Sequence, residues 1–301
     1  MRTDFGVDQA DGLRRLLVAN QTRAITLVSG KAGVGRTSVA INLAAALARS
    51  GKDVLVLDEN DAPHNVADCL GLHAGHDLID AVRGMGSLRE SVLGASGFSV
   101  LSARRSGRQL NKPEQQRLES ALAEMSVGMD VILVDAAMPA AHHYADSYGF
   151  SRGAAFLVVV DATASGITKS YALIKRLALE NARAQFGIVV NKAVDERAAG
   201  TVFENMAELA RRNFAASLEY MGCIPRDDRL KRAMHLGKAV VEAFPASESA
   251  RSCVEIAHQL LRMPARQKEA EDGVRTVIRE MVQQALQPRQ RYSRENAHVV
   301  N

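Results

Sequence analysis

Short apolar runs rich in Val, Ile and Leu alternate with longer segments of helical periodicity along most of the chain. The runs predict strands at residues 24–28, 54–58, 98–101, 131–135, 156–160 and 186–190. Helical spacing predicts helices over residues 38–49, 113–127, 167–181, 201–215, 226–236 and 249–261. Continuous apolar strands that alternate with helices indicate an α/β fold with a single doubly wound, mostly parallel sheet covered by helices on both faces.

Length and composition narrow the class of protein. A chain of 301 residues can bury a sizeable core. It contains no long apolar run, and acidic Asp4 and Asp8 stand where a signal peptide would carry basic and apolar residues, so we expect a cytoplasmic protein. The cysteines at positions 69, 223 and 253 lack metal-ligand spacing and are expected to be buried thiols.

The stretch Ser29 to Ser38, "SGKAGVGRTS", follows the first predicted strand and precedes the first predicted helix. It is close to the phosphate-binding loop G-x-x-x-x-G-K-[ST], in which backbone N–H groups hold phosphates, the lysine reaches the β- and γ-phosphates, and the hydroxyl binds magnesium. Gly30, Gly35 and Thr37 fit this pattern, but Arg36 replaces the lysine. A plain glycine turn between strand and helix is the alternative.

The form "GKAGVGRT" resembles the deviant loop signature "KGGVGKT" of the MinD/ParA ATPases. The resemblance implies a P-loop NTPase fold of the MinD type, ATP and Mg²⁺ as cofactors, and a homodimer formed over bound ATP. It also implies that Lys31 contacts the nucleotide of the partner subunit. The implied nucleotide contacts in this loop are Gly30, Lys31, Gly33, Val34, Gly35, Arg36, Thr37 and Ser38.

Two strand ends carry the acidic part of the resemblance. "LDENDAPHNVADCLGL" is similar to the family's "DADLGLANLDxxLGL", which makes Asp58 a magnesium-site residue and puts Asn60 where the family has the aspartate that orients water. "VILVDAAMP" makes Asp135 the magnesium-linked aspartate, but Ala136 to Pro139 lack the family's switch glycine. The implied metal ligands are Thr37, Asp58 and Asp135, and the implied catalytic residues are Lys31, Asn60 and Asp135. Arg36, Asn60 and the missing glycine together predict slow ATP hydrolysis.

Further stretches extend the resemblance over about residues 24 to 262. "VVVDATASGITKSYALIKRL" is similar to "VVTTPEPTAITDAYALIK", with Asp161-Ala162-Thr163 in place of Thr-Pro-Glu. "GIVVNKA" puts Asn191 where the family recognises adenine, and "MGCIPRDDRLKRAMHLGKAV" puts Pro225 and Asp227 near the base.

The two ends of the chain point to a branch of the family. "DQADGLRRLL" resembles the N-terminal D-Q-A-x-x-L-R motif of the flagellar-number regulators, the FlhG/FleN branch, in which a helix binds the flagellar placement GTPase FlhF. The implied partner-binding residues are Asp8, Gln9, Ala10, Leu13 and Arg14, and an ordinary amphipathic helix is the alternative. Near the other end an apolar stripe predicts a helix that lies in a membrane interface or docks on the protein's own core. Its residues are Val274, Val277, Ile278, Met281, Val282, Ala285 and Leu286.

The sequence thus predicts an N-terminal partner-binding extension (1–22), a MinD/ParA-like nucleotide-binding domain (23–262), and a charged linker with a C-terminal amphipathic helix and tail (263–301). The implied function is an ATP-binding regulator of flagellar number and placement that also binds a flagellar transcription activator or switch-complex protein. It would be cytoplasmic or peripheral, on the inner face of the cell membrane or at the pole.

Two alternatives remain. One is a pseudo-ATPase that binds partners without responding to nucleotide, and the other is a ParA-like DNA-partition ATPase. The basic loop Arg104, Arg105 and Arg108 is more simply a solvated loop than a DNA contact, and His142, His143 and Asp146 make a weak metal-site pattern. Iron-protein reductases share the fold, but the three cysteines do not match their cluster-binding pattern.

Overall fold

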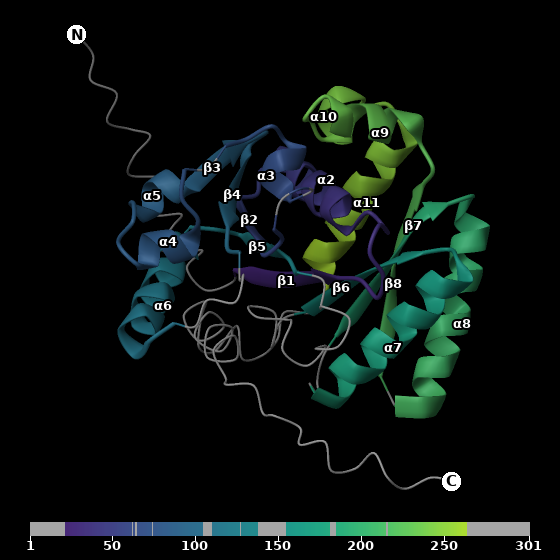
Figure 1. Cartoon of the computed structure of the whole chain (residues 1–301). Helices are drawn as coiled ribbons and strands as arrows, with labels where there is room; N and C mark the ends of the chain where they lie inside the picture. The colour runs from purple at the N-terminus through teal and green to yellow at the C-terminus, as the bar shows by residue number, and fades with distance from the viewer. Residues whose placement is uncertain are drawn as a thin grey trace, which may run out of the picture.

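An eight-stranded sheet in the order β3-β4-β2-β5-β1-β6-β7-β8 forms the centre of the computed structural model (Figure 1). The structure describes residues 22–61, 63, 65–73, 75–104, 110–126, 128–137, 155–180, 185–214 and 216–263. Neighbouring strands are parallel except β3, which pairs antiparallel with β4. The predicted α/β class and mostly parallel sheet are therefore confirmed.

The strands match the apolar runs closely. They are β1 (Arg23–Val28), β2 (Val54–Asp58), β3 (Val92–Ala95), β4 (Phe98–Ser102), β5 (Val131–Asp135), β6 (Ala155–Asp161), β7 (Phe186–Ala193) and β8 (Leu218–Pro225). Every predicted strand is present. The edge strands β3 and β8 were not predicted, because glycines and polar residues interrupt their apolar residues.

The long helices also follow the predicted segments, with starts shifted by one to five residues. They are α2 (Arg36–Arg49), α6 (Lys112–Ser126), α7 (Ala164–Glu180), α8 (Glu196–Phe214), α9 (Asp228–His235) and α11 (Glu248–Arg262). The short helices α3 (Val66–Cys69), α4 (Leu78–Val82), α5 (Leu88–Ser91) and α10 (Val240–Ala243) were not predicted, because four or five residues are too few to show a helical period.

Alternate residues of each strand face opposite layers of helices. On β2, Val54 and Val56 join a core with α2, α10 and α11, whereas Leu55 and Leu57 join a core with α4 and α6. Buried residues of β6 and β7 pack on α7 and α8 on the latter face. Figure 1 shows α2 and α11 on one side of the sheet and α7 and α8 toward the other. Two helical layers therefore shield the strands, as a parallel sheet requires.

One polar residue fixes the central helix α2 to the layer around it. The side chain of Asn42, fully buried, donates to the carbonyl of Ser38 (2.7 Å) and accepts from the backbone N–H of Val240 (2.6 Å) at the start of α10. Buried backbone donors need a partner, so Asn42 satisfies a group that the apolar surroundings cannot.

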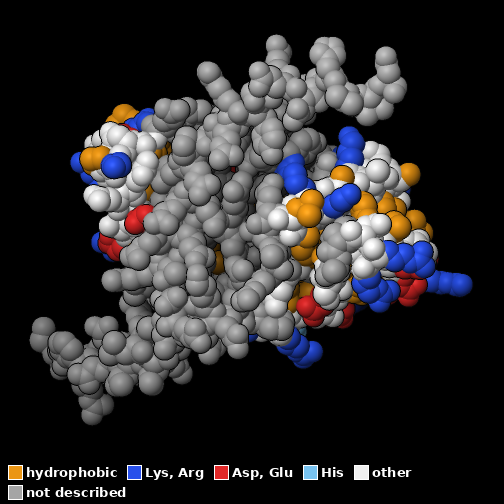
Figure 2. Space-filling model, turned by 90° about the horizontal axis from the view of Figure 1, so that it is seen from below, with side chains coloured by type: hydrophobic (Ala, Val, Ile, Leu, Met, Phe, Trp, Pro, Cys, Tyr) orange, Lys and Arg blue, Asp and Glu red, His pale blue; other side chains and the backbone are white. Residues whose placement is uncertain are grey.

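The outer face of α7 and α8 keeps some apolar side chains exposed. Leu179 on α7 is 72% exposed and Leu209 on α8 is 45% exposed. Figure 2 shows apolar side chains among lysines and arginines on this part of the surface. Within the described residues, no helix combines the length and apolar character that a membrane crossing needs.

Replacement of Asn42 by alanine should lower the free energy of unfolding by about 2 kcal/mol, because it leaves the buried Val240 N–H without an acceptor. Asn213→Ala is the control, since this exposed amide on α8 also makes two hydrogen bonds but its partners can turn to water. Urea unfolding of both variants measures the difference. Equal losses would show that the buried bond has no special weight.

Candidate functional site

The register of the parallel strands brings the predicted acidic residues together. Asp58 is the last residue of β2 and Asp135 the last residue of β5, and the two are direct neighbours across the sheet. Asp135 also lies beside Leu27 of β1, just before the glycine-rich loop. Both aspartates are almost completely buried. Two carboxylates and the loop therefore meet at the carboxyl edge of the sheet, where ligands bind in open α/β folds.

Two glycines of the loop are required by close packing. A Cβ on Gly30 would lie 2.3 Å from the backbone carbonyl carbon of Lys169 in α7. Gly35 has a left-handed conformation (φ 92°), and a Cβ there would lie 2.5 Å from the Asn191 amide nitrogen. The loop therefore sits close against α7 and β7, which explains these glycines independently of any ligand.

Arg36, the first residue of α2, points into the acidic edge. Its Nε donates to Asp135 Oδ1 at 2.6 Å, and its Nη2 donates to Asn60 Oδ1 at 2.7 Å. A longer contact of 3.5 Å joins Nη1 to Ser29 Oγ. The guanidinium is only 7% exposed and Asp135 is fully buried, so this is an interior ion pair.

Asn60 connects the arginine to both aspartates. Its Nδ2 donates to Asp58 Oδ1 (3.0 Å) and to Asp135 Oδ2 (2.9 Å), while its Oδ1 accepts from Arg36. Only an amide can donate to the carboxylates and accept from the arginine in this way. The hydrogen bonds of Asn60 therefore depend on Arg36, a relation that neither sequence motif shows by itself.

The two hydroxyl residues at the start of α2 have different surroundings. Thr37 Oγ1 donates to Asp135 Oδ2 at 2.6 Å. The buried Oγ of Ser38 has no hydrogen-bond partner among the described residues. An orphaned hydroxyl next to a phosphate-binding loop suits an oxygen of a bound ligand.

The two buried aspartates, Asp58 and Asp135, have only one positively charged partner among the described residues, Arg36, which is too little to neutralise two carboxylates. Burial, and after it the charge of Asp135, raises the pKa of Asp58 to about 7, although hydrogen bonds from Asn60 and Val66 oppose the shift. Arg36 supplies one positive charge to the pair. One carboxyl therefore remains partly protonated near neutral pH.

Lys31 contacts its own chain. Its Nζ lies 3.0 Å from Asp161 Oδ2 at the end of β6 and 3.4 Å from Thr163 Oγ1. Burial alone would raise the pKa of Asp161, but hydrogen bonds from Thr163 and Lys31, together with the lysine charge, lower it below its ordinary value. These two partners are among the residues by which the chain departs from the family pattern.

Lys192 is a neighbour of the loop that the sequence interpretation missed. It has a left-handed backbone (φ 58°), and its Nζ donates to the carbonyl of Gly33 at 2.6 Å. The sequence did contain one sign of this contact, because Lys192 directly follows Asn191 near the end of β7.

The residues expected near the adenine base contact parts of the protein itself. The Asn191 amide donates to the carbonyl of Val34 at 2.7 Å. Pro225 ends β8, and Asp227 caps α9, where its carboxylate accepts from the Arg229 N–H and from Ser249. Asp227 thus also holds α9 against α11, and the structure leaves its role toward a base as a prediction.

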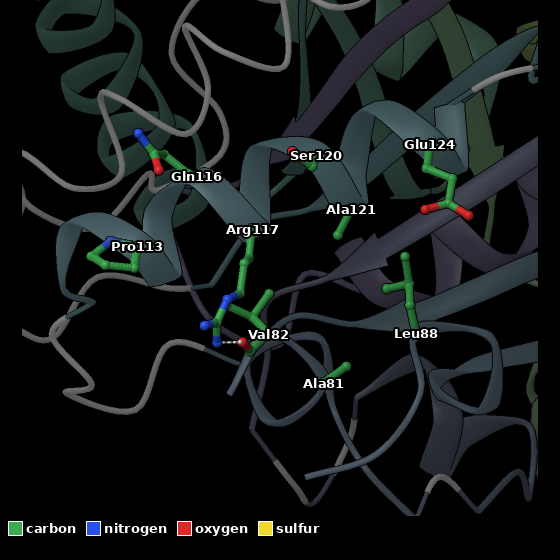
Figure 3. A pocket seen from close by; sticks show the side chains of 9 residues that line it. All are labelled: Ala81, Val82, Leu88, Pro113, Gln116, Arg117, Ser120, Ala121 and Glu124. Atoms are coloured by element: carbon green, nitrogen blue, oxygen red, sulfur yellow. Dashed lines mark hydrogen bonds between the residues drawn. The ribbon is translucent and has the colours of Figure 1, made fainter. Parts of the chain in front are cut away.

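Cavities elsewhere on the surface do not include the loop. One of about 440 Å³ lies between α4, α5 and α6, and Figure 3 shows Arg117 there donating to the carbonyl of Val82. Another of about 400 Å³ lies beside α8 and the start of β8. Neither cavity is lined by a residue that the sequence predicts to contact nucleotide. The candidate site is therefore identified by the polar residues at the strand ends and not by a cavity.

Several predicted functional residues lie outside the described part of the chain. They include the N-terminal motif Asp8 to Leu17, the apolar stripe from Val274 to Leu286, the loop from Met138 through Asp146, and Arg105 and Arg108. In the described ranges, no group of three or more His, Cys, Asp or Glu side chains is arranged to hold a metal ion.

Comparison with known proteins matches residues 25–240 to the CobQ/CobB/MinD/ParA nucleotide binding domain. The antiactivator FleN of Pseudomonas aeruginosa is 33% identical over 250 residues, which cover 80% of this chain and 87% of FleN. The flagellum site-determining protein YlxH of Helicobacter pylori is 26% identical over 246 residues, covering 80% and 82%. The fold is shared with the septum site-determining protein MinD of Pyrococcus horikoshii, solved with Mg-ADP, with a TM-score of 0.61, 22% identity, and coverage of 80% and 96%.

Stability should fall as the pH rises from about 5.5 to 7 and then level off, by on the order of 2 kcal/mol. The folded chain retains a proton on Asp58 up to about pH 7, whereas the unfolded carboxyl has lost it by about pH 5, so the folded state is favoured at the acidic end. Asp58→Asn should remove this slope whatever its absolute stability, and Asp53→Asn, an exposed aspartate, should keep it. Urea unfolding across this pH range measures the slopes. An unchanged slope in Asp58→Asn would contradict the assignment.

Proposed function

Because the chain belongs to the family of CobQ/CobB/MinD/ParA nucleotide binding domains, we propose that it is an ATP-binding regulator of flagellar number and placement. It dimerises over bound ATP and hydrolyses ATP slowly. Its output is the choice of partners that it holds in the nucleotide-bound state.

The site at the end of β1 is the observation that carries nucleotide binding. Gly33 and Gly35 have left-handed backbones, α2 begins directly after the loop, and the buried Ser38 hydroxyl has no partner in the described chain. A glycine loop that opens onto a helix N-terminus presents backbone N–H groups and a favourable dipole to phosphates. These features support a nucleoside phosphate as the ligand, and the family supports ATP.

The flagellar role is supported by relatives and by the N-terminal motif. FleN is described as an antiactivator and YlxH as a flagellum site-determining protein. The "DQADGLR" opening resembles the segment that binds the placement GTPase in this branch. We therefore assign Asp8, Gln9, Ala10, Leu13 and Arg14 to a FlhF-like GTPase, and a second surface to a flagellar transcription activator or switch-complex protein.

Slow hydrolysis follows from the groups around Asp135. Asn60 stands where an aspartate would orient water, and an amide is a poor proton acceptor. Arg36 and Thr37 both donate to Asp135, and Ala136 and Ala137 provide no glycine hinge after it. Each feature removes part of the hydrolytic machinery without removing the loop itself.

Dimerisation requires a rearrangement of Lys31. In the described conformation its ammonium is paired with Asp161 and Thr163 of the same chain. A contact with the partner's nucleotide breaks this pair, and a phosphate chain with several negative charges is a stronger acceptor than one carboxylate. The Lys31–Asp161 pair therefore favours the monomer until ATP is present.

ATP should convert the protein from monomer to dimer, as followed by light scattering in the samples used for calorimetric titration with ATP and ADP, each with and without Mg²⁺. Lys31→Ala should keep ATP binding within a few-fold but weaken dimerisation about tenfold or more, since it removes the proposed contact with the partner's nucleotide as well as the pair with Asp161. Asp161→Asn should strengthen dimerisation by releasing Lys31. Lys52→Ala is the matched control, because Lys52 pairs with Asp130 at 3.5 Å away from the loop.

Absence of binding at millimolar ATP under all conditions would overturn the proposal and leave a pseudo-ATPase that acts through its partner surfaces. Steeply salt-dependent binding to nonspecific DNA would instead favour the partition ATPases. Loss of dimerisation in Lys52→Ala to the same degree as in Lys31→Ala would contradict the role given to Lys31.

A further inference from the structure

The acidic edge already contains a cation of its own. In phosphate-binding loops the hydroxyl after the lysine and the aspartate after a neighbouring strand hold Mg²⁺. Those positions are Thr37 and Asp135, and their oxygens are 2.6 Å apart here. Arg36 places its charged group against the same aspartate, 2.6 Å from Oδ1, and is itself 7% exposed.

The residues as arranged do not fit a magnesium ion. Asp135 accepts from Arg36 on Oδ1, and from Thr37 and Asn60 on Oδ2, so both carboxylate oxygens face donors. Mg²⁺ needs octahedral oxygen ligands at about 2.0–2.1 Å and would lie against a guanidinium of like charge. The ion could enter only if Arg36 left its partners.

The surrounding residues are adapted to the arginine. Asn60 accepts from Nη2 and turns its own donor toward Asp58 and Asp135. An aspartate at this position would place a third carboxylate among the two, and a lysine at position 36 could not make both the Nε and Nη2 bonds with a single terminal nitrogen. Arg36 and Asn60 therefore act as one unit, fixed in the protein interior.

A fixed guanidinium can do part of what the metal does for phosphates. It places one positive charge beside the loop, and arginine binds phosphate oxygens through paired N–H donors. In the arrangement described above, Nη1 makes only a 3.5 Å contact with Ser29. We propose that the Arg36 guanidinium replaces the divalent cation, so that this loop binds a nucleoside di- or triphosphate as the free anion instead of its magnesium complex.

This inference rests on the proposed nucleotide binding, and its first test compares affinities with and without metal. The dissociation constants of fluorescent ATP and ADP analogues are measured in millimolar Mg²⁺ and in EDTA. For the native chain they should differ by less than about threefold. The double variant Arg36→Lys with Asn60→Asp should lose about tenfold or more in EDTA, because it restores the usual donor set. Arg49→Lys, the same exchange at the exposed end of α2, should behave like the native chain.

A second test needs no nucleotide. Mn²⁺ or Mg²⁺ alone should leave the melting temperature of the native chain unchanged, because Arg36 already pairs with Asp135. The same ions should raise the melting temperature of the double variant and of Arg36→Ala, whose buried aspartates lack a cation. If Arg36→Ala does not fold, the double variant provides the comparison by itself.

The outcomes separate the two proposals. Nucleotide binding that improves about tenfold with Mg²⁺ in the native chain would overturn the cation replacement and leave the proposed function intact. No nucleotide binding would overturn both the proposed function and the binding of a free anion. Metal stabilisation of the variants alone would then show only that Arg36 occupies the cation position. Metal stabilisation of the native chain equal to that of the variants would overturn the replacement on its own.

Discussion

The adjacency of Asp58 and Asp135 in the parallel register is the constraint on which the rest of the site depends. Two carboxylates buried at neighbouring strand ends repel each other, and the sheet gives them no freedom to separate. Some cation or proton has to compensate for their charge. In this chain Arg36 supplies a positive charge, Asn60 and Thr37 supply hydrogen bonds, and the raised pKa of Asp58 lets that carboxyl keep a proton near neutral pH. Removal of one partner from such a buried pair typically costs about 3–5 kcal/mol, so these residues depend on one another for stability.

Polar side chains around the glycine-rich loop are likewise paired with groups of the protein itself. Lys31 meets Asp161, Lys192 meets the carbonyl of Gly33, and the Asn191 amide meets the carbonyl of Val34. Each of these three side chains has a partner inside the protein that occupies a donor a ligand could otherwise use. A nucleotide therefore competes with contacts inside the protein, and its affinity reports a difference between two sets of bonds.

Much of the fold could be predicted because buried parallel strands are continuous apolar runs, and glycines and aspartates mark where they end. The edge strands and the helices of four or five residues could not be predicted, since their register and packing come from tertiary contacts instead of from a local period. For the site, the sequence identified Arg36, Asn60 and Asp135 one at a time. Their mutual contacts depend on the side-chain direction of Arg36, which no spacing encodes. Lys192 could not be predicted as a loop contact from its place after Asn191 alone, because only its left-handed backbone turns it back toward the loop.

The mutual fit of Arg36 and Asn60 also has an evolutionary consequence. A chain with lysine at position 36 and the present Asn60 would leave either the Asn60 oxygen or Asp135 Oδ1 without the donor it now has. A chain with Arg36 and an aspartate at position 60 would gather three carboxylates around one guanidinium. Both single-step routes back to the usual family pattern therefore pass through a less stable protein. Once a lineage has acquired both residues, selection for folding alone keeps them together, whether or not the nucleotide chemistry is still under selection.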